Sequence, residues 1–185
     1  ILCGLYGEDP SVLENLVAIA SRHAGVVGID LAGGPAPGHR FSIEDDARAF
    51  SKARDAGLGR TVHAAEGRSP REIHVAIDKL HAQRIGHGTT LLDDKAVLDL
   101  VPENNVVIEA CPTSNWHTGV IGDVAEHPIK AWLSAGVRVC VCADNTLLSN
   151  TSTARELALV RQACFLDDEE VRRVVQCGHD AAFRR

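Results

Sequence analysis

Hydrophobic residues along this chain gather in short runs, and longer segments of helical spacing separate them. The runs are apolar throughout rather than at every second position, which is typical of parallel strands covered on both faces. Strands are therefore predicted at residues 1–5, 26–31, 60–63, 84–86, 105–110 and 137–143. Helices are predicted at residues 11–23, 41–56 and 69–83, from about 93, at 127–135 and 153–160, and from about 167.

The alternation of strand and helix, repeated about six times, predicts a parallel α/β fold. Six such units fit either an open doubly wound sheet or part of a (β/α)8 TIM barrel. Residues 28–34 do not match the G-x-G-x-x-G fingerprint of a dinucleotide-binding fold, so the open sheet is the weaker interpretation. No change of composition divides the chain, and we expect residues 1–185 to form a single domain.

The starts of three helices are predicted from capping sequences, in which Ser or Thr is followed three residues later by Glu. These sequences lie at residues 11–14, 69–72 and 153–156. In such a box the hydroxyl caps the first turn and the glutamate reaches back to it. The second sequence also has proline at the expected first helical position.

Charge and composition exclude some classes of function. The formal net charge is -6, which argues against a nucleic-acid or membrane-surface partner. No apolar run reaches the roughly 18 residues of a spanning helix, and the first residues lack the features of a signal peptide. The chain has no methionine and opens within an apolar run, so we expect a piece of a longer protein.

The six cysteines are predicted to be buried free thiols, as expected in the cytoplasm. They lie within apolar runs, and no C-x-x-C pair occurs. Cys140 and Cys142 are predicted to share one face of a strand. A soft-metal pair there is an alternative to core packing.

Three segments place ionisable residues at the carboxyl ends of predicted strands: TVHAAEG at 61–67, RIGHG at 84–88 and VCVCADN at 139–145. Active sites of parallel barrels are built at these strand ends. His63 and Glu66 are spaced to share one side of a turn. The alternative is a histidine that caps a helix and a solvated glutamate.

His87 and Asp144 are the other two candidates. His87 lies between two glycines, which we expect to expose the imidazole. Asp144 follows a buried run, where a carboxylate needs a cation or hydrogen-bond donors to offset desolvation. A helix cap is the alternative for Asp144, and Asn145 or Thr146 could share that role.

Other polar residues are given no catalytic role. Seven further histidines are predicted to be surface or packing residues, and Glu109 is expected to be paired with a partner that the sequence does not identify. The Ala32-Gly33-Gly34 sequence allows a close approach of backbone to a ligand. A catalytic zinc takes three or four ligands, whereas this chain offers one clear histidine and one clear aspartate.

The chain resembles the adenosine deaminase family of zinc-dependent barrel hydrolases. The resemblance covers residues 1–152 and rests on VGIDLAG, TVHAAE, RIGHG, CPTSN and ADN, which occur in the family's order. It implies a partial barrel that corresponds to strands 3–8. It also implies hydrolysis of a 6-aminopurine nucleoside to the 6-oxopurine and ammonia, without a nucleic-acid or membrane partner.

Residue roles follow from the same resemblance. His63 and Asp144 would bind Zn²⁺, Glu66 would protonate purine N1, and His87 would activate or orient the attacking water. Gly33 would offer its backbone N–H to purine N3. Asn145 stands where many relatives have a second aspartate that contacts purine N7.

The sequence departs from the family at the zinc site. The family's His-x-His pair is absent, so we expect residues 1–185 to lack an intact zinc site and the partial barrel to have unpaired, association-prone edges. Adenosine or 2'-deoxyadenosine is the expected substrate. Adenine or AMP is an alternative, as is a non-catalytic partial barrel that binds nucleosides or a partner protein.

Overall fold

The computed structural model describes residues 1–184 as a six-stranded parallel sheet with helices between the strands. The strands are β1 (Leu2–Leu5), β2 (Gly28–Ala32), β3 (Gly59–Ala64), β4 (Arg84–His87), β5 (Val107–Ala110) and β6 (Arg138–Val141). The α-helices are α1 (Pro10–Ala20), α2 (Ala47–Asp55), α3 (Arg71–Asp78), α4 (Lys95–Glu103), α5 (Pro112–His117), α6 (Ile129–Ser134), α7 (Thr153–Ala163) and α8 (Asp168–Asp180). Three 3-10 turns are η1 (Ile43–Asp46), η2 (Leu91–Asp93) and η3 (Val124–Glu126).

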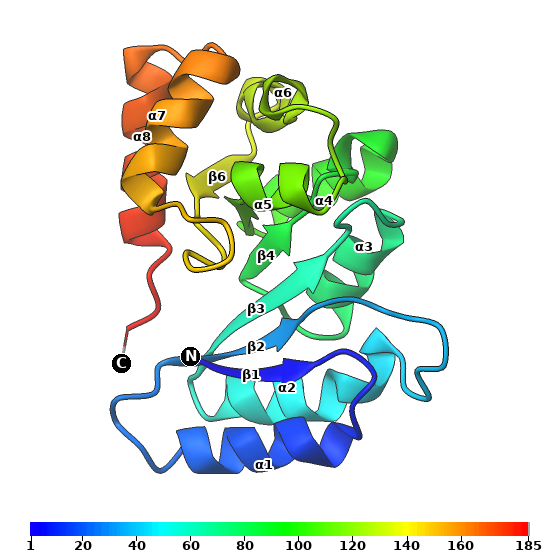
Figure 1. Cartoon of the computed structure of the whole chain (residues 1–185). Helices are drawn as coiled ribbons and strands as arrows, with labels where there is room; N and C mark the ends of the chain where they lie inside the picture. The colour runs from blue at the N-terminus through cyan, green and yellow to red at the C-terminus, as the bar shows by residue number, and fades with distance from the viewer. Residues whose placement is uncertain (185) are drawn as a thin grey trace.

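The strands lie in the sheet in the order in which they occur in the chain. Each is parallel to its neighbour, and Figure 1 shows the resulting twisted sheet with α1 and α2 beneath β1–β3 and with α7 and α8 beside β6. Within residues 1–184, β1 and β6 each pair on one edge only. The sheet is thus an incomplete α/β barrel, which confirms the predicted fold class.

The two faces of the sheet differ in chemistry. One face is apolar and packs against the helices, with Ile29, Val62 and Ile108 fully buried in the main core. Positions in register share a face, so Asp30 and Thr61, paired across β2 and β3, both lie on the opposite face. The expectation of strands apolar on both faces is therefore wrong for this second, inner face.

Pairing on the inner face identifies the partner of Glu109. Its Oε1 lies 3.1 Å from Nε of Arg84, and its Oε2 accepts a hydrogen bond from the Thr61 hydroxyl at 2.6 Å. The two charged side chains are mostly buried, so the ion pair and the hydroxyl offset the cost of removing them from water. Glu109 is paired, as expected.

The predicted capping boxes do not form at the predicted positions. Helix α1 begins earlier, because Asp9 accepts from the Ser11 N–H at 2.9 Å and Pro10 opens the first turn. Helix α7 is capped by Ser152. At α3 the N-cap position is Pro70, whose ring has no polar atom to cap the turn.

The glutamates of two of these sequences have other partners. Glu72 accepts from the Ala65 N–H at 2.7 Å instead of capping α3. Glu156 is only 1% exposed. It accepts from the hydroxyl of Thr113 at 2.5 Å and from that of Thr151 at 2.6 Å. None of these partners lies at the spacing of a capping box, and Thr113 is 43 residues from Glu156 in the chain.

Some element boundaries also differ. The predicted helix at 41–56 is the 3-10 turn η1 followed by the shorter α2, and the helix expected from residue 93 begins after η2. Helix α5 was not predicted, since its six residues are too few to show a helical repeat of apolar positions.

All six cysteines are free thiols, as predicted. Four are buried, whereas Cys3 is exposed and Cys142 is partly exposed, so the expectation of burial is wrong for these two. Cys140 and Cys142 share a face with their sulfur atoms 3.9 Å apart. Among residues 1–184, no helix is both long and apolar enough to cross a membrane.

Candidate active site

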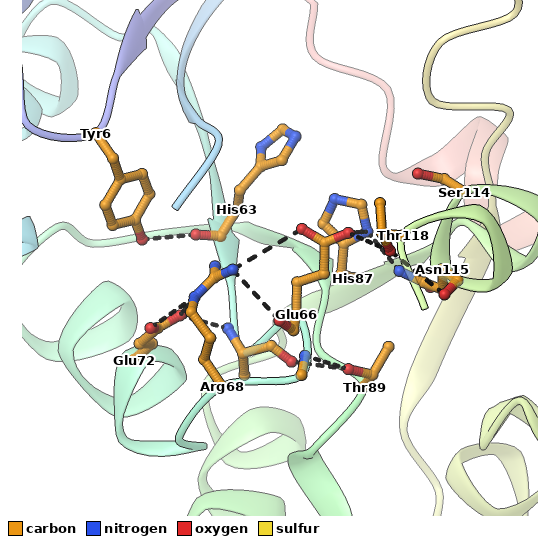
Figure 2. A network of polar contacts seen from close by, with 12 residues as sticks. Tyr6, His63, Glu66, Arg68, Glu72, His87, Thr89, Ser114, Asn115 and Thr118 are labelled. Carbon is orange, nitrogen blue, oxygen red and sulfur yellow. Dashed lines mark hydrogen bonds and ion pairs between the residues drawn. The ribbon is translucent and has the colours of Figure 1, made fainter. Parts of the chain in front are cut away.

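The ends of β3 and β4 bring three predicted site residues together. His63 is the second-last residue of β3, and His87 is the last residue of β4. Their ring centroids are 5.0 Å apart. Oε1 of Glu66, in the turn after β3, lies 3.6 Å from Nδ1 of His87. Figure 2 shows the three side chains on these neighbouring strand ends.

His63 is held from both its backbone and its ring. The hydroxyl of Tyr6 donates to the His63 carbonyl oxygen at 2.7 Å. Nδ1 of the ring lies 3.2 Å from Oδ1 of Asp30. This contact directs Nε2 away from Asp30, as carboxylates commonly do for histidines that bind metals.

The acidic neighbours of His63 raise the pKa of its imidazole. Burial lowers the pKa of His63, but the hydrogen bond and charge of Asp30, with smaller contributions from Asp144 and Glu109, raise it above its ordinary value. Sequence reasoning missed Asp30, although it lies inside the VGIDLAG segment. Its position on a strand beside that of His63 was the available signal.

His87 is buried rather than exposed. It is 2% exposed, so the expectation that its flanking glycines expose the imidazole is wrong. Asn115 covers the ring, with Nδ2 3.0 Å from Nδ1 of His87. The backbone is left-handed at both residues, with φ of 70° at His87 and 61° at Gly88. Glycine adopts this conformation without steric cost, so Gly88 allows the chain to turn after β4 rather than exposing the imidazole.

The environment of His87 differs from that of His63. Burial lowers the pKa of His87, and the charges of His63 and Arg68 act in the same direction against those of Glu66 and Asp144. The ring is therefore held neutral. Two neighbouring histidines with pKa values shifted in opposite directions are a common feature of sites that move protons.

Glu66 lies in a tight turn that begins as β3 ends. Backbone φ is 55° at Ala65 and 64° at Gly67, which turns the chain sharply on either side of the glutamate. The Glu66 carboxylate accepts from the Thr118 hydroxyl at 3.4 Å and lies 3.9 Å from Nη1 of Arg68. It is mostly shielded from solvent and has donors on two sides.

Asp144 comes from the segment after β6. The residue is exposed, so the argument from desolvation at a buried strand end is wrong for this carboxylate. Its charge nevertheless contributes to the pKa of both His63 and His87. The Ser114 hydroxyl donates to Oδ2 of Asp144 at 2.6 Å and fixes one side of the group.

The two predicted substrate-binding residues lie at the same end of the sheet. Gly33 follows β2 with φ of +80°, and no atom occupies the space where its side chain would begin. Asn145 is exposed, and its Oδ1 accepts from the N–H groups of Leu147 and Leu148 at 3.1 and 2.9 Å. Asn145 thus caps the following turn, as the alternative interpretation allowed, and leaves Nδ2 as a donor.

Two of the described side chains are of the kinds that bind zinc. Imidazole and carboxylate are donors that zinc prefers, and His63, oriented by Asp30, fits such a role together with Asp144. No group of three His, Cys, Asp or Glu residues able to hold a metal occurs within residues 1–184.

The other histidines lie at the surface or in packing positions, which confirms their prediction. His127 is the most buried, at 3% exposed, and its ring packs edge-on against Trp132 at 5.2 Å between centroids.

Comparison with known proteins identifies the family. The adenosine deaminase family model matches residues 1–184. Adenine deaminase of Agrobacterium fabrum is 39% identical over 96% of this chain and 54% of its own length. Adenosine deaminase of Clostridium kluyveri is 38% identical over 99% of this chain and 52% of its own length.

A solved structure supports the same relationship. The crystal structure of adenine deaminase from Arthrobacter aurescens superposes with a TM-score of 0.88 and 26% identity, covering 99% of this chain and 55% of that one. The chain spans about half the length of the relatives it matches. It belongs to the adenosine deaminase family.

Proposed function

We propose that the whole protein hydrolyses adenosine or 2'-deoxyadenosine to inosine or 2'-deoxyinosine and ammonia. The observation that carries the proposal is the grouping of His63, Glu66 and His87 at adjacent strand ends. The family match over residues 1–184 supports deamination as the general chemistry. The proposal goes beyond this general chemistry in naming a nucleoside, rather than a free base, as the substrate.

Glu66 acts as the proton donor to purine N1. Its carboxyl group is shielded from bulk water and lies beside Thr118 and His87. Protonation at N1 withdraws electrons from C6 and makes that carbon the target of water. A positioned general acid of this kind contributes typically about 10²–10⁴-fold to a rate.

His87 orients the attacking water and can accept its proton. Burial lowers the pKa of the imidazole, so the ring is neutral near pH 7, with one nitrogen that donates a hydrogen bond and one that accepts, according to the tautomer. Asn115 restricts the rotation of the ring. Glu66 and His87 are close enough for proton transfer between them by way of the substrate or water.

His63 and Asp144 are the proposed zinc ligands of this chain. Asp30 and Ser114 hold these two groups through one hydrogen bond each. Zinc, when bound, supplies Lewis-acid activation of water. The remaining ligands are proposed to come from outside residues 1–184.

Gly33 and Asn145 are proposed to hold the purine. The open space beside Gly33 admits an aromatic ring close to its backbone N–H, which would donate to N3. Nδ2 of Asn145 can donate to N7, because its Oδ1 already accepts two backbone N–H groups. A neutral amide donates without first binding a proton, unlike a carboxylate.

Adenine is the second candidate substrate. The observation that favours it is the 39% identity to a relative named adenine deaminase. Both candidates share the chemistry at C6 and differ in whether a ribose must be accommodated.

We also propose that the protein acts in the cytoplasm as a single barrel domain. Six free thiols among the described residues suit a reducing compartment. The unbroken run of strands in one sheet supports a single domain.

The test is ammonia release by the zinc-loaded whole protein from adenosine, 2'-deoxyadenosine and adenine at equal concentrations, with zinc content measured on the same samples. Turnover of the nucleosides at least tenfold above that of adenine supports the proposal. Preference for adenine would replace the substrate. Stoichiometric zinc without any turnover would contradict deamination of these substrates, and absence of both zinc and turnover would favour a non-catalytic nucleoside-binding protein.

A further inference from the structure

A cavity of about 550 Å³ lies at the end of the sheet opposite the candidate active site. Its wall includes the first residues of β3, β4, β5 and β6, together with the segment that follows α8. The ring of Phe183 occupies the space beside Gly59, where a Cβ atom would lie 2.1 Å from the ring. The segment that follows α8 can therefore pass this end of the sheet only because residue 59 is a glycine, which leaves room for the Phe183 ring.

The lining of this cavity is strongly basic. Its charged members are five arginines and one aspartate, in a chain whose formal net charge is -6. The members are Arg54, Arg60, Arg84, Arg138, Arg184 and Asp180. The aspartate accepts from Nε2 of Gln176 at 2.8 Å and offsets only one of the five positive charges.

Arg60 has only neutral hydrogen-bond partners among residues 1–184. Its Nη1 donates to the carbonyl oxygen of Leu58 at 2.6 Å, and its Nε donates to that of His81 at 2.8 Å. These bonds fix the guanidinium without neutralising it. Burial lowers the pKa of Arg60, and the like charge of Arg54 lowers it further.

Arg138 and Arg184 are held in the same manner. Nη1 of Arg138 donates to Oδ1 of Asn105 at 2.7 Å, and Nη2 of Arg184 donates to the carbonyl oxygen of His179 at 3.4 Å. Within the described part of the chain, neither arginine has a carboxylate at ion-pair distance, although several others do.

The remaining two arginines have acidic partners. Arg84 is paired with Glu109 and stacks on Phe183, with its guanidinium carbon 3.7 Å from the ring centroid. Arg54 is paired with the solvent-exposed Asp55. Three guanidinium groups thus share one cavity without a carboxylate at ion-pair distance among residues 1–184, and Asp180 is the one acidic residue of the described lining. The resulting excess of positive charge favours a bound anion.

We infer that this cavity binds a small phosphorylated molecule at a site separate from the deaminase site. Guanidinium groups present planar pairs of N–H donors that match phosphate oxygens. The volume falls within the roughly 300–1,000 Å³ of typical ligand pockets and exceeds the need of a single phosphate. A molecule with two or more phosphate groups, free or as part of a nucleotide, fits both the charge and the space.

The test is isothermal titration calorimetry of the whole protein with pyrophosphate and, separately, with ATP. The variant R60Q/R138Q removes two of the uncompensated charges. We expect binding to weaken at least tenfold in this variant and to weaken with added salt. The control R22Q/R172Q makes the same change of net charge at exposed positions outside the cavity and should bind as wild type does.

The ligand series distinguishes the source of the phosphate. Equal affinity for pyrophosphate and ATP indicates recognition of phosphates alone, and tighter binding of ATP indicates a nucleotide. Both results support the site. Absence of binding by folded wild-type protein at millimolar ligand, or equal loss in both double variants, would overturn it. If R60Q/R138Q does not fold, single variants R60Q and R138Q decide the question in the same titration.

Discussion

The hydroxyl of Ser114 donates a hydrogen bond to Oδ2 of Asp144 at 2.6 Å and so joins helix α5 to the segment after β6. Ser114 is 8% exposed, whereas Asp144 lies at the surface with φ of 51°. A buried donor therefore fixes the orientation of an exposed carboxylate. Asp144 keeps its other oxygen available, which is the arrangement expected of a metal ligand with a supporting hydrogen bond.

The variant S114A is predicted to weaken zinc binding by the whole protein. Loss of the hydroxyl frees the Asp144 side chain to rotate, and removal of such supporting groups typically costs about 10–100-fold in metal affinity. Competition with a chromophoric chelator measures the change. S134A is the matched control, because among the described residues the Ser134 hydroxyl bonds only to the backbone oxygen of Lys130. Zinc affinity equal to that of wild type would show that Ser114 does not position a ligand.

Removal of the Glu156 carboxylate is predicted to destabilise the fold. Glu156 accepts from the Thr113 N–H at 3.0 Å and from the hydroxyls of Thr113 and Thr151. E156A leaves these donors without their acceptor, at a cost of about 2–4 kcal/mol in the free energy of unfolding. Urea unfolding measures the change, with E169A as an exposed control. A loss below about 0.5 kcal/mol would contradict the structural role.

His127 is predicted to make stability dependent on pH. Burial is the main cause that lowers the pKa of His127 to about 4 in the folded protein, against about 6.5 in an unfolded chain. The unfolded chain therefore binds the proton more tightly. Stability is complete above about pH 6.5 and is lost as the pH falls toward 4, by about 2 kcal/mol between pH 7 and pH 5.

The variant H127N isolates this contribution. An asparagine oxygen can accept from the Ile129 N–H in place of Nδ1 of His127. Chemical denaturation at pH 7 and pH 5 should show a smaller loss of stability in H127N than in wild type. Asp46 acts in the opposite sense, since burial raises its pKa to about 6, but it is present in both proteins and cancels in the difference. Equal losses in the two proteins would exclude His127 as the source.

The sequence was sufficient for the order of strands and for the segments that carry the site. The strands are short and apolar on their outer face, and ionisable residues or glycine lie within three residues of the carboxyl ends of β2, β3, β4 and β6. His63, Glu66 and His87 could be grouped because the ends of parallel strands meet at one edge of a sheet. Their separation in the chain was not an obstacle, because β3 and β4 are neighbours.

Residues that support the site could not be predicted in the same way. Asp30, Ser114 and Asn115 act through contacts with residues 28–33 positions away in the chain. Such pairs have no fixed spacing, so only the register of strands and the packing of α5 identify them. The burial of His87 was missed for the same reason, since Asn115 covers it.

The errors in the predicted helix starts have a different cause. The Ser/Thr-to-Glu spacing occurs at residues 11–14 and 153–156, but a residue just before each sequence caps the helix instead. A capping residue competes with its neighbours for the same N–H groups. Asp9 and Ser152 have the better geometry, and local spacing does not reveal this.

The most direct test of the account is the rate of ammonia release from adenosine by the zinc-loaded whole protein and its variant E66Q. Wild-type protein is predicted to turn over adenosine, and E66Q to lose about 10²–10⁴-fold in kcat while its zinc content is unchanged. E103Q changes an exposed glutamate of α4 and should keep wild-type activity. Adenosine turnover in E66Q at the wild-type rate would contradict the assignment of Glu66 as the proton donor and, with it, the proposed mechanism.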